Sequence, residues 1–157
     1  MKTIVRQHTE AERRWFAGGG LHLWKLTAEE TGGDFFLLED HLVEGKTTPL
    51  HCHPDVAETL YLIEGTIVSH IDGVEREVGP GGVVMVPPGV PHAFRVTSPT
   101  ARLLAIQTPG RGGEAFFRDA SDPSRDDSGP VDFARLREAA GRHDGIEILG
   151  PPPFKLR

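Results

Sequence analysis

The sequence predicts an all-β protein, a closed barrel or a jelly roll, and three observations support this prediction. Nineteen glycines and thirteen prolines are scattered along the 157 residues as turn signals, without forming a repeat. Short apolar or alternating segments recur between those turns, at the spacing typical of barrels and jelly rolls. No segment of ten or more residues with helical periodicity interrupts them.

Eight segments have the composition and alternation of strands. They are residues 21–26, 35–43, 59–64, 66–71, 74–78, 83–86, 93–96 and 102–107. Asp72-Gly73 separates two of them and can adopt the positive φ angles of a type I′ turn, which predicts a tight hairpin.

The chain changes character after residue 107. A polar, turn-rich loop at 119–130 is expected to be mobile, and a short C-terminal helix is expected to follow it. Pro130 suits the first position of this helix, and Gly141 or Gly145 suits its end. One further strand is predicted at 146–149.

Length and composition predict one domain over residues 1–157. Its barrel core spans about 21–107, with an N-terminal strand extension at 1–34 and a C-terminal loop, helix and tail at 108–157.

The net charge of −6 without any cluster of Lys and Arg argues against nucleic acid and membrane partners. A single cysteine, no apolar signal segment and no apolar run near 20 residues lead us to expect a soluble, cytoplasmic protein.

The segment TPLHCHPDVAETLYL at residues 48–62 carries the candidate chemistry. Alternation along a strand places His51 and His53 on one face, and a turn at 54–55 resets the phase so that Glu58 can face them. A proline-stiffened loop at 87–91 delivers His92 to the start of another strand. Three imidazoles and one carboxylate suit one divalent Fe, Mn, Ni, Co or Zn ion, and the lack of thiolate ligands argues against a structural zinc site.

The alternative interpretation assigns these polar groups to structure alone. We apply it to the other five histidines, which we expect to be surface or core residues: His8, His22, His41, His70 and His143. For the predicted ligand set, burial without a metal or hydrogen-bond partners would cost about 1 to 3 kcal/mol per group, which favours metal binding.

These residues resemble the two sequence motifs of the cupins. The first motif is matched by Gly45, His51, His53, Glu58 and Gly65, separated by five, one, four and six residues. The second is matched by Gly81, Pro87, Gly89 and His92, separated by five, one and two residues. In this chain Val96 replaces an asparagine that often ends the second motif. The resemblance implies a single cupin domain, a small jelly-roll barrel with the metal ligands inside it.

Within the cupins, the chain looks most similar to the quercetin dioxygenase-like group. This resemblance implies a metal-dependent dioxygenase that takes dioxygen and a small aromatic or enol-type substrate, with Glu58 as both ligand and catalytic base. The predicted substrate pocket consists of Val84, Val86, Phe94 and Val96.

Other functions of the same site stay open. An oxygen-independent isomerase, cyclase or lyase would use the same metal, and a non-enzymatic cupin would only bind a small molecule, or would keep an empty site. Cupin regulators usually add a helical DNA-binding domain, for which this chain has no room.

We also expect a homodimer, formed by pairing of the apolar N-terminal strand with a second barrel.

Overall fold

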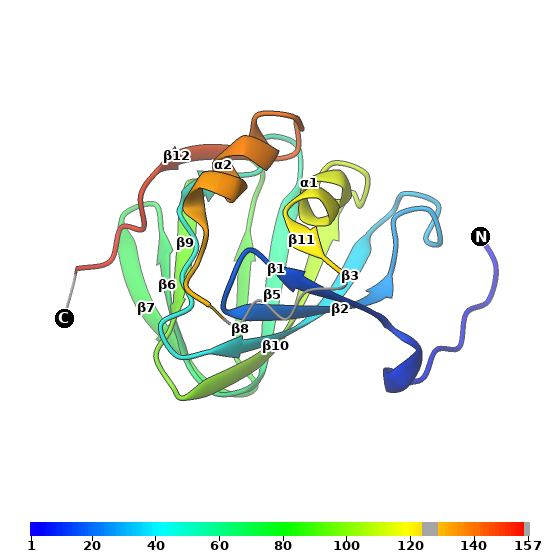
Figure 1. The fold of residues 1–157 in the computed structure, drawn as a ribbon, viewed down its shortest axis with the longest axis horizontal. Helices are drawn as coiled ribbons and strands as arrows, with labels where there is room; N and C mark the ends of the chain where they lie inside the picture. The colour runs from blue at the N-terminus through cyan, green and yellow to red at the C-terminus, as the bar shows by residue number, and fades with distance from the viewer. Residues whose placement is uncertain (124–128, 156–157) are drawn as a thin grey trace.

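The structure is a computed structural model that describes residues 1–123 and 129–155, and its fold is a jelly roll of two antiparallel sheets (Figure 1). The larger sheet has the order β11-β1-β2-β3-β10-β5-β8, and the smaller one the order β12-β4-β9-β6-β7. The strands are β1 (Glu12–Phe16), β2 (Gly20–Leu26), β3 (Phe36–Val43), β4 (Leu50–Cys52), β5 (Ala57–Glu64), β6 (Ile67–Ile71), β7 (Val74–Val78), β8 (Val83–Val86), β9 (His92–Val96), β10 (Thr100–Thr108), β11 (Ser121–Asp122) and β12 (Glu147–Gly150). The helices are a short 3-10 helix η1 (His8–Glu10), α1 (Glu114–Asp119) and α2 (Phe133–Ala140).

The predicted all-β fold is confirmed, and all eight predicted strands are present with ends within two residues of the predicted ones. The predicted hairpin is also confirmed. Asp72 and Gly73 join β6 to β7 with φ angles of 48° and 80°, both in the left-handed region that a type I′ turn requires.

The C-terminal part differs from the prediction in two respects. The sequence predicted one helix, whereas α1 precedes α2 and is too short to show a helical period. Pro130 is not at the start of α2, because Asp132 caps the helix by accepting a hydrogen bond from the Arg135 amide at 3.0 Å. Gly141 ends the helix as predicted. The predicted mobile loop includes residues 124–128, which lie outside the described residues.

The expected dimer contact through the N-terminal strand is wrong, because β2 has no free edge. It pairs with β3 on one side and with β1 on the other, and β1 had not been predicted. The homodimer itself stays a prediction. Three exposed apolar side chains, Tyr61 of β5 and Val83 and Met85 of β8, form a different surface on the outer face of the larger sheet.

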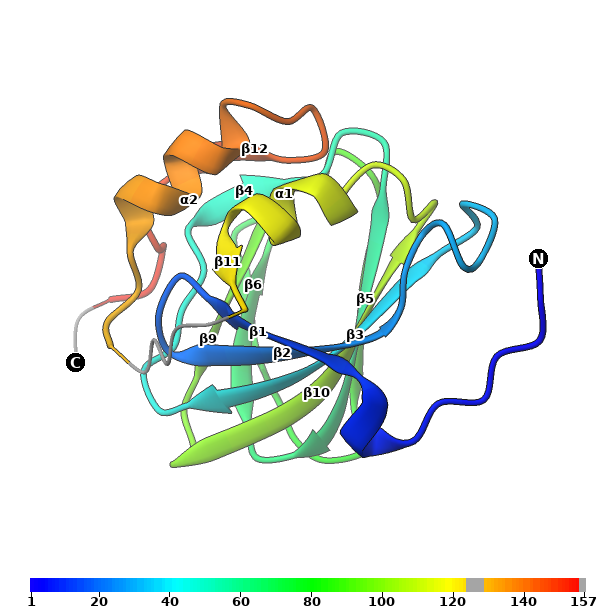
Figure 2. The ribbon, with the colours of Figure 1, turned by 45° about the vertical axis from the view of Figure 1, so that its right-hand side comes forward.

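Two of the three hydrophobic clusters among the described residues lie near the barrel interior and the helices. The first lies between the sheets and includes Trp24, Phe36 and Leu103. The second lies under the helices and joins Phe16 of β1 to Phe116 of α1 and to residues of α2. Figure 2 shows α1, α2 and β12 gathered over one end of the barrel, so the C-terminal residues form a cap.

No helix in the described parts of the chain has the length and apolar character needed to cross a membrane.

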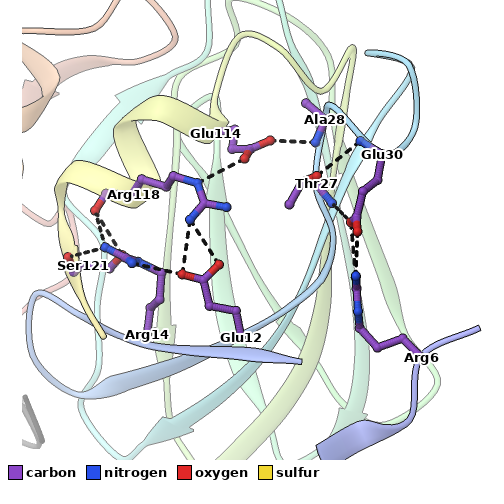
Figure 3. Close-up of polar contacts among 9 residues, drawn as sticks. All are labelled: Arg6, Glu12, Arg14, Thr27, Ala28, Glu30, Glu114, Arg118 and Ser121. Atoms are coloured by element: carbon purple, nitrogen blue, oxygen red, sulfur yellow. Dashed lines mark hydrogen bonds and ion pairs between the residues drawn. The ribbon is translucent and has the colours of Figure 1, made fainter. Parts of the chain in front are cut away.

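A network of charged side chains holds α1 against the N-terminal strands (Figure 3). Arg118 of α1 binds both carboxylate oxygens of Glu12 at 3.1 and 3.2 Å, and its guanidinium lies 4.2 Å from the centre of the buried Trp24 ring. Glu114 accepts a hydrogen bond from the Ala28 amide at 2.6 Å. Arg14 of β1 donates to the carbonyl oxygens of Arg118 and Ser121, both at 3.0 Å. These contacts place α1 over the end of the barrel.

Replacement of Arg118 by methionine should therefore loosen the cap. The Arg118→Met variant loses the ion pairs and the cation–π contact with Trp24, and we expect a destabilisation of about 1 to 2 kcal/mol. The measurement is the midpoint of thermal unfolding, which should fall by a few degrees. The control Arg142→Met removes an arginine that pairs only with exposed carboxylates and should change the midpoint little. Equal midpoints for the two variants would contradict a structural role for the Trp24 contact.

Candidate metal centre

Both sheets contribute to the cluster of predicted metal ligands. His51 lies on β4 and faces His92, the first residue of β9, in the smaller sheet. Glu58 lies on β5 of the larger sheet, and His53 follows the end of β4. All four side chains are buried, and their candidate ligand atoms lie within 4.8 Å of one another. The structure thus brings together four residues that span 42 positions of the sequence, between the two sheets.

The local backbone explains how this convergence arises. β4 ends at Cys52 and β5 begins at Ala57, so the intervening turn resets the alternation, and Glu58, like Leu60 and Leu62, points inward. Gly89 precedes His92 with a φ of 76°, a conformation that favours glycine, and its amide donates to the His53 carbonyl oxygen at 2.8 Å. This hydrogen bond ties the loop before His92 to the segment that carries His53.

Each of the three imidazoles has its tautomer set by a backbone carbonyl group. The Nδ1 atom of His51 donates to Pro49 at 2.9 Å, that of His53 to Gly145 at 2.8 Å, and that of His92 to Val90 at 2.8 Å. A carbonyl oxygen only accepts, so the proton lies on Nδ1 in each ring. The three Nε2 atoms then carry lone pairs, as metal-bound histidines require.

Glu58 completes the cluster as an oriented carboxylate. Its Oε1 atom accepts a hydrogen bond from Gln107 Nε2 at 3.0 Å and lies 3.6 Å from His53 Nε2, and its Oε2 atom lies 3.2 Å from His92 Nε2. Three imidazole lone pairs and a carboxylate in a buried site repel one another unless a cation or added protons compensate them. The donor set therefore fits a divalent transition metal ion bound by His51, His53, Glu58 and His92.

The protein environment holds these ligands in different protonation states. Burial, reinforced by the charges of His92 and His53, lowers the pKa of His51 to about 3. Burial also acts to lower the pKa of His53, but the hydrogen bond and charge of Glu58 outweigh it, and the pKa of His53 is raised. For Glu58, burial is outweighed by its contacts with His53 and His92, whose Nε2 atoms donate when the rings are protonated, and these contacts hold its pKa well below the usual range. His51 and Glu58 are thus ready to bind a cation at neutral pH.

A cavity reaches this cluster from the capped end of the barrel. His51 and Glu58 line it at one end, and Phe16, Phe94, Phe116 and Phe117 form aromatic walls. The cavity has a volume of about 50 Å³, and one water needs on the order of 10 to 15 Å³. Its size therefore corresponds to a few waters.

Only one of the four predicted pocket residues lines this cavity. Phe94 is in its wall, whereas Val84, Val86 and Val96 are buried in the core cluster between the sheets. β5 separates β8, with Val84 and Val86, from the cavity, and Val96 lies at the far end of β9 opposite Ile67. The prediction of these three valines as pocket residues followed strand alternation, which gives the face of a residue but not its depth in the barrel.

The cavity also contains a second group of buried polar residues that the sequence reasoning missed. His22 of β2 and Asp40 of β3 are directly paired across the two strands, and both line the cavity. His22 had been assigned to surface or core. Asp40 could have been recognised, because it occupies an inward position between Leu38 and Leu42 in an otherwise apolar strand face. Lys46 lines the cavity as well and donates from Nζ to the carbonyl oxygens of Phe16 and Gly18.

The His22 and Asp40 pair is deeply buried and incompletely hydrogen-bonded. Burial raises the pKa of Asp40 to about 8, aided by the charges of Glu58 and Glu39 and opposed by Lys46. Burial also lowers the pKa of His22 well below its usual range, aided by the charges of Lys46 and Arg14. His22 Nε2 lies 3.4 Å from Asp40 Oδ1, but within the described part of the chain neither Asp40 Oδ1 nor His22 Nδ1 has a hydrogen-bond partner. Such groups cost about 1 to 3 kcal/mol each if they stay unsatisfied.

Comparison with known proteins agrees with this architecture. Residues 39–107 match the family model described as the cupin domain. The chain is 29% identical over 124 residues to quercetin 2,3-dioxygenase from Bacillus subtilis (strain 168), a match that covers 79% of this chain. The same match covers 36% of the Bacillus protein, so this chain corresponds to little more than a third of that relative.

Solved structures show the same fold with different described activities. A predicted oxalate decarboxylase from Thermotoga maritima superimposes with a TM-score of 0.62 at 22% identity, covering 68% of this chain and 99% of that one. The polyketide cyclase RemF from Streptomyces resistomycificus superimposes with a TM-score of 0.57 at 27% identity, covering 69% of this chain and 80% of that one. The fold is therefore shared by proteins with more than one described activity.

Removal of one imidazole should abolish metal binding. The His51→Ala variant leaves three ligands, and we expect its affinity for a divalent metal to fall by about a hundredfold or more. Mutation of residues that only hydrogen-bond to metal ligands already lowers metal affinity by about 10- to 100-fold. The measurement is metal content per chain after purification without chelator. His41→Ala, which changes a partly exposed histidine paired with Glu39, is the control and should keep its metal. Wild-type metal content in His51→Ala would contradict the ligand set.

Metal affinity should fall as the pH falls through neutrality. The raised pKa of His53 means that protons begin to compete for its Nε2 atom above the ordinary value of about 6.5. His51, with its pKa near 3, is already neutral and adds no competing proton above that pH. We expect the dissociation constant for Zn²⁺ to rise by about tenfold per pH unit for each competing proton on going from pH 8 to pH 5. A pH-independent dissociation constant over this range would show that His53 is not a ligand.

Proposed function

We propose that this chain, which is a cupin with three imidazoles and one carboxylate converging inside its barrel, is a metal-dependent dioxygenase of the quercetin dioxygenase-like group. The observation that carries the proposal is that two of the four clustered candidate ligands, His51 and Glu58, line an aromatic-walled cavity. Similarity to a quercetin 2,3-dioxygenase supports the choice of reaction. Its substrates would be dioxygen and a small aromatic or enol-type molecule.

The cavity supports a planar substrate. Phe94 and Phe117 offer aromatic faces that bind a flat ring through apolar contact, and the core below excludes water from it. Since the cavity corresponds to a few waters in size, a single ring would need the cap to move outward, and a molecule with several fused or linked rings would need a larger movement. We therefore infer a substrate with a single planar ring or a small enol.

Glu58 has the position of a catalytic base. It is an ionised carboxylate that lines the cavity, and Gln107 fixes one of its oxygens by a hydrogen bond of 3.0 Å. A substrate hydroxyl placed at this end of the cavity can give its proton to Glu58. A divalent metal bound by the four ligands would supply a Lewis acid for the resulting oxygen anion and, when redox-active, would support reaction with dioxygen.

An oxygen-independent cyclase, isomerase or lyase is the second candidate. The similarity in sequence and fold to a polyketide cyclase supports it. The same residues would then hold the metal and move a proton, and no dioxygen would be consumed. Turnover of one substrate in air and under argon separates the two classes, since only a dioxygenase requires oxygen.

The test of the proposed reaction is oxygen uptake against a panel of small enols, phenols and flavonols. We expect oxygen consumption by the metal-loaded wild-type protein and a decrease of about a hundredfold or more in Glu58→Gln, which cannot accept the proton. Glu64→Gln, a change of the same type at an exposed position of the same strand, should have wild-type activity. Oxygen uptake by Glu58→Gln at the wild-type rate would contradict the role of Glu58 as the base.

A further inference from the structure

Two pairs of polar residues line the cavity, and we call them its two ends. His51 and Glu58 form the first end, and Asp40 and His22 form the second. Leu60 of β5 and its neighbour across the strands in β10, Ala105, also line the cavity. Asp40 lies on β3, on the other side of β10 from Glu58 on β5, so these two carboxyl groups are carried by different strands of the larger sheet.

The second end has hydrogen-bonding capacity that the described protein atoms leave unused. Asp40 and His22 line the cavity, and Asp40 Oδ1 and His22 Nδ1 are buried without a hydrogen-bond partner among the described residues. The contact between the two side chains joins His22 Nε2 to Asp40 Oδ1 at 3.4 Å and is not aligned as a hydrogen bond. Nearly all buried polar atoms in folded proteins have a partner, so this pair calls for a polar group from outside the chain.

We propose that Asp40 and His22 form a second recognition point, which binds a hydroxyl group at the end of the substrate remote from the metal ligands. This inference rests on the proposed function, because it takes the metal cluster as the first point of attachment. A hydroxyl group both donates and accepts, and it rotates, so it can bond to Asp40 Oδ1 or to His22 Nδ1. An alkyl group at that position would leave both atoms unsatisfied. The substrate class is thus a planar enol or phenol that carries a further hydroxyl group across the ring.

A matched pair of single-ring ligands tests this proposal. Kojic acid and allomaltol are both hydroxypyranones that chelate metals through an adjacent ketone and hydroxyl, and they differ in one group across the ring, hydroxymethyl in the former and methyl in the latter. Binding of each is measured by calorimetry on the zinc-loaded protein, in which no redox reaction takes place. We expect the wild-type protein to bind kojic acid at least about tenfold more tightly than allomaltol, the value of one good hydrogen bond.

Variants of the second recognition point should remove this preference and leave the metal intact. In Asp40→Leu and in His22→Gln we expect weaker kojic acid binding and unchanged allomaltol binding, with one zinc per chain. Asp40→Asn, which keeps a polar side chain, should restore part of the preference. The control Asp72→Asn changes an aspartate in the β6–β7 turn and should keep the full preference.

The possible outcomes separate this inference from the proposed function. Equal binding of the two ligands by the wild-type protein, or a full preference in Asp40→Leu and His22→Gln, would overturn the second recognition point alone. Since the wild-type comparison needs no variant, it decides the matter even if a substitution prevents folding. Failure of both ligands to bind the zinc-loaded protein would overturn the recognition point together with the metal-centred site. Lack of oxygen uptake alongside a clear preference for kojic acid would contradict only the dioxygenase reaction.

Discussion

The site depends on three hydrogen bonds that set the tautomers of its histidines. Because backbone carbonyl groups accept the Nδ1 protons of His51, His53 and His92, the Nε2 atoms of the neutral rings carry lone pairs in the cluster that includes Glu58. The carbonyl groups belong to the segments just before β4 and β9 and to the C-terminal cap, so loops set the chemistry of ligands that strands carry. The jelly roll brings these loops and both sheets to one point, where a bound cation would balance the converging charges.

The barrel and the cluster of candidate metal ligands could be predicted from sequence because their signals are local. Alternation within short segments predicted the strands. The turn between His53 and Glu58 resets the inward and outward alternation of side chains, and this reset lets both residues point into the same cluster. The cap could not be predicted this way. α1 is six residues long, and β1 contains mostly charged residues that acquire their roles only through contacts with distant side chains, such as that of Arg118 with Glu12. Such contacts leave no periodic pattern in the sequence.

The cavity shows a different limit of sequence reasoning. Alternation assigned Val84 and Val96 correctly to the interior, but it could not say which interior residues lie in the core and which face the empty space. Asp40 is the opposite case, since a carboxyl group at an inward position of an otherwise apolar strand face is visible in the sequence. A polar residue where burial is expected is informative because the protein must compensate for its lost hydration. For this fold, such residues indicate the cavity better than apolar ones do.

The hydrogen bond between His53 and Gly145 gives the cap a role in the thermodynamics of the site. Gly145 lies between α2 and β12, and its backbone packs so closely on Gly112 that a Cβ atom there would overlap the Gly112 carbonyl oxygen. Opening the cap to admit a ligand would take this carbonyl oxygen away from His53 and weaken its hold on a metal ion. By the reciprocity of linked equilibria, metal binding must then favour the closed cap by the same coupling free energy. Metal binding and opening of the cap would thus be thermodynamically coupled.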